Sequence, residues 1–193
     1  IAFVVFLSLF NTAFANVTLP NIFSDNMVLQ RSSEVTIWGF ANPQEEVVIT
    51  PSWNNQEYKI KASNQAKWEI KFPTPKEGGP YTISIKGYNE VVLKNILIGE
   101  VWVCSGQSNM EMNASWGITN GEEAIKNASN PNIRFFTVPK LTATTPQSNL
   151  SGNWTECTPE TMKYFSAVGY FFAKRLQEDL KNVPIGLISS NWG

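Results

Sequence analysis

The chain has 193 residues, of which 42% are hydrophobic and 12% aromatic, enough to bury the core of one large domain or two small ones. Its net charge is −1 and its 15 basic residues are scattered, so no basic patch predicts a nucleic acid or an anionic membrane surface as partner. Two cysteines and the absence of histidine exclude a disulfide framework and leave no Cys/His cluster with metal-ligand spacing.

The first fifteen residues have the pattern of an export signal. Residues 1–10 are almost wholly apolar and are followed by Ala13-Phe14-Ala15, the small-residue pattern of a signal-peptidase site. An apolar run of about ten residues is too short to span a bilayer, and a buried core helix is the alternative interpretation. We therefore expect residues 1–15 to be a signal peptide whose charged start is missing. The mature chain is then expected to be periplasmic or secreted, with no membrane span.

Residues 16–95 contain short segments in which apolar and polar residues alternate. The alternation is strict at 67–72 and 81–86, and shorter apolar runs lie at 35–38, 47–49 and 58–60. Turn residues such as Asn42-Pro43 and Gly78-Gly79-Pro80 separate these runs. A period of two predicts half-buried strands, so we expect an antiparallel β-sandwich domain of about seven strands at 16–95.

Beyond residue 95 the pattern changes to strands separated by helices. The near-continuous apolar runs at 96–103 and 185–188 are typical of parallel strands buried on both faces, and residues 133–138 predict a third strand. Apolar residues three or four apart predict a helix at 166–180, and residues 122–128 predict a shorter one. We expect residues 96–193 to form an α/β domain that is incomplete at its C-terminus, with Cys104 packed inside it.

A turn with two serines follows the strand at 96–103. Gly106 lets the backbone bend there, so Ser108 is expected to stand exposed at the carboxyl edge of the sheet, where α/β proteins usually carry out their chemistry. A nucleophilic serine needs a neighbouring base, most often histidine, and this sequence has none. Either Ser108 is not catalytic or the groups that activate it lie outside these residues.

Several separated motifs, in order, carry a resemblance to a known family. They are Ser-Asp-Asn-Met-Val-Leu-Gln-Arg at 24–31, Ile-Trp-Gly at 37–39, Gly-Gln-Ser-Asn-Met at 106–110 and Pro-Ile-Gly-Leu-Ile at 184–188. Together they resemble the sialate O-acetylesterase family of SGNH serine hydrolases, of which this sequence looks like an N-terminal fragment. The resemblance implies a three-layer α/β/α SGNH-hydrolase-like domain that removes acetyl groups from sugar hydroxyls, without a metal or an organic cofactor.

The resemblance also implies roles for two residues of the chain. Ser108 matches the family's nucleophile, which would form an acetyl-Ser108 intermediate, and its backbone N–H would be one donor of the oxyanion hole. Gly193, or the residue after it, matches the glycine whose N–H serves the same hole. The aspartate and histidine of the triad are expected beyond residue 193, so the fragment alone is expected to be inactive.

The substrate implied is an O-acetylated sugar, with sialic acid first and acetylated xylan or another polysaccharide as the alternative. A second alternative is a non-catalytic carbohydrate-binding or adhesion module built on the β-domain. Trp116 and Trp154 lie in polar loop sequence and are the preferred candidates for stacking on a sugar ring. Trp192 and the strand tryptophans are instead expected to be core residues.

Overall fold

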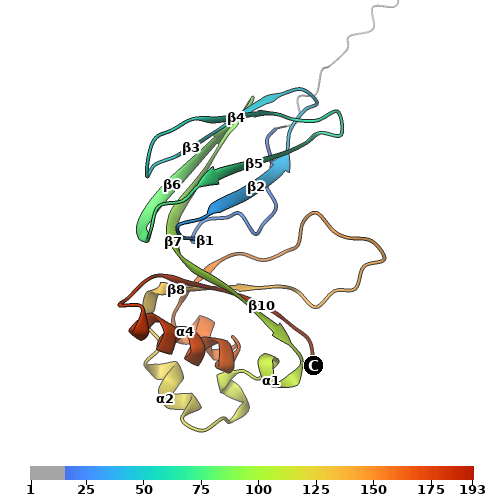
Figure 1. Cartoon of the computed structure of the whole chain (residues 1–193). Coiled ribbons are helices and arrows are strands. Elements are labelled where there is room, and N and C mark those ends of the chain that lie inside the picture. The colour runs from blue at the N-terminus through green and yellow to red at the C-terminus, as the bar shows by residue number, and fades with distance from the viewer. Residues whose placement is uncertain (1–15) are drawn as a thin grey trace, which may run out of the picture.

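The computed structural model describes residues 16–193, so the expected signal peptide at 1–15 lies outside the described residues. An eight-stranded mixed sheet runs in the order β4-β3-β6-β7-β10-β8-β9, with β1 also paired to β7, and β2 and β5 form a separate two-stranded sheet (Figure 1). The strands are β1 (Val28–Gln30), β2 (Glu34–Phe40), β3 (Glu46–Pro51), β4 (Tyr58–Lys61), β5 (Lys67–Pro73), β6 (Gly78–Lys86), β7 (Glu90–Gly106), β8 (Asn130–Thr137), β9 (Thr155–Cys157) and β10 (Ile185–Asn191). The helices are α1 (Ser108–Glu111), the 3₁₀ helix η1 (Ala114–Trp116), α2 (Gly121–Lys126), α3 (Pro159–Lys163) and α4 (Ala167–Asp179).

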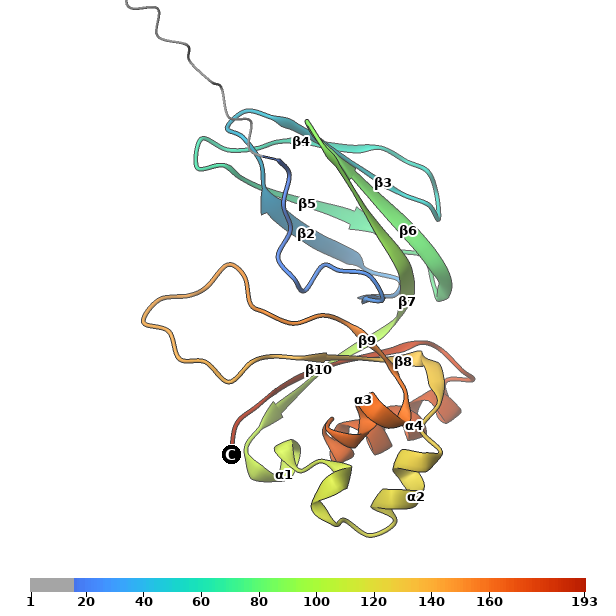
Figure 2. The ribbon, with the colours of Figure 1, turned by 180° about the vertical axis from the view of Figure 1, so that it is seen from behind.

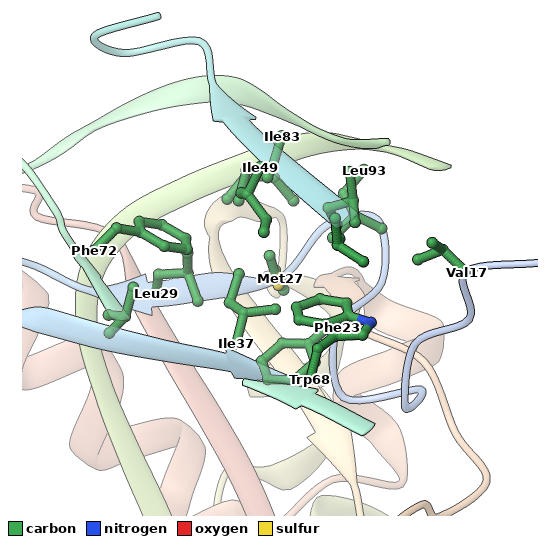
Figure 3. Packing of buried hydrophobic residues seen from close by; sticks show 14 of the residues in the cluster. Val17, Phe23, Met27, Leu29, Ile37, Ile49, Trp68, Phe72, Ile83 and Leu93 are labelled. Carbon is green, nitrogen blue, oxygen red and sulfur yellow. The ribbon is translucent and has the colours of Figure 1, made fainter. Parts of the chain in front are cut away.

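The N-terminal strands pack in two layers around one apolar core. Alternation places Ile37 of β2 and Trp68 of β5 on the inner side of the two-stranded sheet, facing Ile49 of β3 and Ile83 of β6 (Figure 3). All four side chains are buried, and Met27 fills the space between the layers. The period-two segments of the sequence therefore form strands, as predicted.

The first layer differs from the expected antiparallel sandwich in two respects. The short strand β1 pairs with β7 in parallel. The layer of β4, β3, β6 and β7 also continues into the second half of the chain, because β7 pairs antiparallel with β6 over its first half and parallel with β10 from Glu100 to Gly106. The boundary expected between residues 95 and 96 therefore falls inside β7. The apolar pattern changes there because the strand exchanges one set of paired strands for another, and not because a linker begins.

The second half of the chain builds a parallel sheet with helices on one side. β10 lies between β7 and β8 and is parallel to both. Phe135 and Leu187 point to the helices, whereas Phe136 belongs to the core of the N-terminal layers. Within residues 16–193 the helices cover one face of this sheet, so two of the three expected layers are seen (Figures 1 and 2).

The helix expected at 166–180 is confirmed as α4. The Ser166 side chain caps its start by accepting a hydrogen bond from the N–H of Gly169 at 3.1 Å, and Leu180 is its C-terminal cap. Gly169 lets the helix approach β7, since a Cβ there would lie 3.0 Å from the Cys104 sulfur. Cys104 and Cys157 are both buried free thiols, and they belong to the second apolar core, which lies between this sheet and the helices. None of the helices in the described part of the chain is long and apolar enough to cross a membrane.

The end of β7 is less buried than the sequence predicts. Ile96 and Ile98 are in the core, but Trp102 and Val103 are 43% and 63% exposed. Among the described residues, β10 lies on one edge of this segment and β1 ends level with Gly99 on the other. The expectation of burial on both faces was therefore wrong for the last residues of the run, because in the described part of the chain this end of β7 has a paired strand on one edge only.

A buried arginine joins the two halves of the molecule. The guanidinium of Arg134, on β8, donates to Asn26 Oδ1 at 3.2 Å and forms an ion pair with Glu156 at 3.3 Å. It also donates to the carbonyl of Pro131 at 2.6 Å, and Asn95 of β7 completes the network. Burial lowers the pKa of Arg134, and the Glu156 charge opposes that shift.

Candidate active site

Ser108 stands where β7 runs into α1. Gly106 ends the strand with φ of 147°, a backbone conformation that favours glycine, and Ser108 is the first residue of the helix. Its side chain is exposed at the carboxyl end of β7, as the sequence predicted. The first N–H groups of a helix have no partner within the helix, so the backbone here offers donors at the serine itself.

Gly193 packs directly against Ser108. A Cβ at position 193 would lie 2.3 Å from the Ser108 nitrogen and 2.7 Å from its Oγ, so only a glycine allows this approach. The close approach follows from the sheet, because Asn191 is in register with Gly106 and the Trp192 N–H donates to the Gly106 carbonyl at 3.0 Å. The structure thus brings together the two residues for which the resemblance implied an oxyanion hole.

The N–H of Gly193 already has an acceptor. It donates to Glu111 Oε2 at 2.7 Å, and the other carboxylate oxygen of Glu111 forms an ion pair with Lys140. Glu111 therefore ties together the serine turn, the segment after β10 and the segment after β8. The part of Gly193 in an oxyanion hole stays a prediction, since its hydrogen is directed at Glu111 in this arrangement.

Sequence reasoning did not single out Glu111 or Lys140. Glu111 lies three residues after Ser108, but nothing in its spacing indicates an acceptor for a glycine N–H. Lys140 is 29 residues further along the chain, and only the parallel pairing of β7, β10 and β8 brings its loop to the same edge.

A pocket of about 270 Å³ opens beside this edge. It is lined by Gly106, residues 138–141 and residues 190–192, which are the ends of β7, β8 and β10 and the chain that follows them. Binding outside the carboxyl ends of parallel strands is the general rule for such sheets. The sheet edge and the pocket together offer the exposed hydroxyl of Ser108, backbone N–H donors, and a pocket wall of apolar and polar residues.

The tryptophans are arranged differently from the expectation. Trp154 is only 2% exposed, and its indole N–H donates to the Ile22 carbonyl at 2.8 Å, so the expectation that it stacks on a sugar was wrong. Trp116 is 56% exposed on η1 but does not line the pocket at the carboxyl edge of the sheet. Trp192, expected in the core, is 54% exposed and does line that pocket.

No residue of this sequence can serve Ser108 as a histidine base, because the sequence has no histidine. In the described residues no group of three His, Cys, Asp or Glu side chains is arranged to hold a metal ion. The triad aspartate and histidine therefore remain a prediction that concerns residues outside this sequence.

Curated relatives match most of the chain. It is 31% identical over 189 residues to the human protein called sialate O-acetylesterase, and 32% identical over 186 residues to the mouse protein of that name. Over these residues the chain is similar to the sialate O-acetylesterase family. The matches cover 88% and 86% of the chain but only 36% and 34% of the two relatives, so the chain spans about a third of their length.

A solved structure has the same fold as most of this chain. The crystal structure of a carbohydrate acetylesterase from Xanthomonas citri superposes with a TM-score of 0.87 at 34% sequence identity. The superposition covers 92% of this chain and 40% of that one. A mixed sheet with helices, as in α/β hydrolases, is thus shared by a relative named for sugar deacetylation. No protein-family profile matches the chain.

Proposed function

We propose that these residues are part of a serine esterase that removes O-acetyl groups from sugars. The observation that carries the proposal is the packing of Gly193 against the backbone nitrogen and hydroxyl of an exposed Ser108 at the carboxyl edge of the sheet. The names of the relatives support acetylated sugars as the substrate class. Sialic acid is the sugar that we favour, with acetylated xylan or a similar polysaccharide as the alternative.

The proposed reaction has two steps through an acetyl-Ser108 intermediate. The Ser108 hydroxyl attacks the acetyl carbonyl carbon, and its proton passes to a histidine supplied by residues outside this sequence. The tetrahedral oxyanion collapses, the bond to the sugar oxygen breaks, and that oxygen takes the proton. Water then attacks the acetyl carbonyl in the same way and releases acetate and the free serine.

Backbone donors would stabilise the oxyanion in both steps. The Ser108 N–H is one donor, and the glycine segment at 193 is the source of the second. Removing one such donor in other acyl-transfer enzymes costs about 3 kcal/mol of transition-state stabilisation. In this chain the Gly193 N–H must turn from Glu111 to take that role, or the residue after it must supply the donor.

The test is a pair of serine variants in the full-length protein that carries these residues. Ser108→Ala should lower the hydrolysis of an aryl acetate on the order of 10⁵-fold, whereas Ser105→Ala, at the exposed end of β7, should leave most of it. Acetate release from O-acetylated sialosides and xylosides would then compare the two sugars. Full activity in Ser108→Ala, or its loss in Ser105→Ala, would contradict the assignment.

A further inference from the structure

The pocket at the carboxyl edge of the sheet is built by the ends of three neighbouring strands, and its lining reaches Gly106, two residues before Ser108. Gly106 ends β7, residues 138–141 follow β8, and residues 190–192 end β10. The backbone of this wall is tied down, because the Val138 N–H donates to Ser189 and the Trp192 N–H donates to Gly106. A volume of about 270 Å³ is just below that of pockets for drug-sized ligands, so it suits one small ring.

An aromatic ring forms one wall of this pocket. Trp192 is half-exposed although its backbone is fixed by the sheet, and the exposed side chain of Leu141 lines the same space. A rigid indole offers a large apolar surface at little cost in conformational entropy, and the apolar C–H face of a pyranose is complementary to it. Trp192 directly precedes Gly193, the residue that packs against Ser108.

The charge of the pocket is largely compensated. Lys140 is the one charged residue among those that line it, and its ammonium is paired with Glu111. Ser190 and the backbone groups of the wall provide neutral hydrogen-bonding partners. The lining, within the described part of the chain, therefore leaves no unpaired cation for a bare anion, and its apolar part fits the C–H face of a sugar ring.

We propose that this pocket is the subsite for the pyranose ring of the acetylated sugar, and that Trp192 is the platform on which the ring stacks. The proposal rests on the proposed function and adds to it a residue that determines where the sugar lies. The ligand of the pocket is the sugar ring. An O-acetylated sialoside and an O-acetylated xyloside share that ring chemistry, and the experiment distinguishes them.

The test uses ¹⁹F NMR of the full-length protein with 5-fluorotryptophan and a Ser108→Ala background, so that the ligand persists. The Trp192 signal is assigned by its loss in Trp192→Phe. Methyl glycosides of O-acetylated sialic acid and O-acetylated xylose are titrated separately, with their deacetylated forms as controls. Trp116 is the matched reference, since it is exposed to the same degree and lies outside the pocket.

We expect a saturable shift of the Trp192 signal with at least one acetylated glycoside and no shift of the Trp116 signal. Trp192→Ala should weaken binding by about three- to tenfold, Trp192→Phe by less, and Trp116→Ala not at all. Near-UV circular dichroism identifies a variant that fails to fold, and Trp192→Phe then decides the matter. A shift at Trp116 alone, or unchanged affinity in both Trp192 variants, overturns the proposal.

The outcome for the subsite is separable from the outcome for the enzyme. Saturable binding at Trp192 in a full-length protein that hydrolyses no ester would support the subsite and overturn the proposed esterase function. If hydrolysis of acetylated sugars is lost in Ser108→Ala but its KM is unchanged in Trp192→Ala, the esterase function is supported and the subsite is overturned.

Discussion

Glu111→Ala is expected to slow ester hydrolysis without unfolding the protein. The change removes the acceptor of the Gly193 N–H at 2.7 Å and the partner of Lys140. A hydrogen bond to a charged group contributes about 1.5–3 kcal/mol. An ion pair with a solvent-exposed lysine contributes about 0–1 kcal/mol, and the Lys140 side chain is 42% exposed.

Together the two contributions amount to about 1.5–4 kcal/mol, and a value towards the lower end, about 2 kcal/mol, corresponds to about a 30-fold change in an equilibrium or rate constant. If Glu111 positions the segment at 193 against Ser108, kcat/KM for an aryl acetate in the full-length protein should fall by up to that factor. The loss should appear mainly in kcat. Glu111→Gln keeps an acceptor for Gly193 and should retain most of the activity.

Glu178→Ala is the matched control, because Glu178 is an exposed glutamate of α4 that makes no ion pair in the described part of the chain. Thermal unfolding of all three variants separates a loss of positioning from a loss of fold. Unchanged kcat/KM and an unchanged unfolding midpoint in Glu111→Ala would refute the reasoning and make the bridge an incidental surface contact.

Two further predictions concern stability. Arg134→Met should lower the free energy of unfolding in urea by about 1–3 kcal/mol, because it leaves the side-chain oxygens of Asn26 and Asn95 without that donor and removes the partner of Glu156; a wild-type midpoint would contradict this. Burial raises the pKa of the Cys157 thiol from its ordinary value of 9.0 to about 11, so folding favours the protonated form. The resulting stability is fully present below pH 9 and is lost as the pH rises towards 11, which urea unfolding across that range measures; Cys157→Ala should flatten the dependence, and an unchanged slope in that variant would contradict the assignment.

Local patterns predicted the elements that depend on local contacts. The three-to-four spacing of apolar residues places α4 to within a residue, and alternation identifies β5 and β6. The exposed position of Ser108 follows from a strand that ends in glycine. The place of Gly193 came from the resemblance and not from its own surroundings in the sequence.

The rest depends on contacts between distant segments. Trp154 lies in polar sequence yet is buried, because the carbonyl of Ile22, far away in the chain, accepts its indole hydrogen. Trp192 follows an apolar strand yet is exposed, because it emerges at the end of the sheet. The pairing of Glu111 with Lys140 likewise requires the order of the strands, which apolar periodicity does not contain.

The continuity of β7 has a consequence for how the protein can be divided. Its 17 residues extend over roughly 56 Å and supply a strand to both halves of the molecule. A cut or an insertion near residue 95 would remove from each half the strand on which it is assembled, so neither half is expected to be a folding unit by itself. Limited proteolysis should accordingly fail to release a stable N-terminal piece, and the distance from the β-layers to Ser108 is fixed by a single rigid strand instead of a hinge.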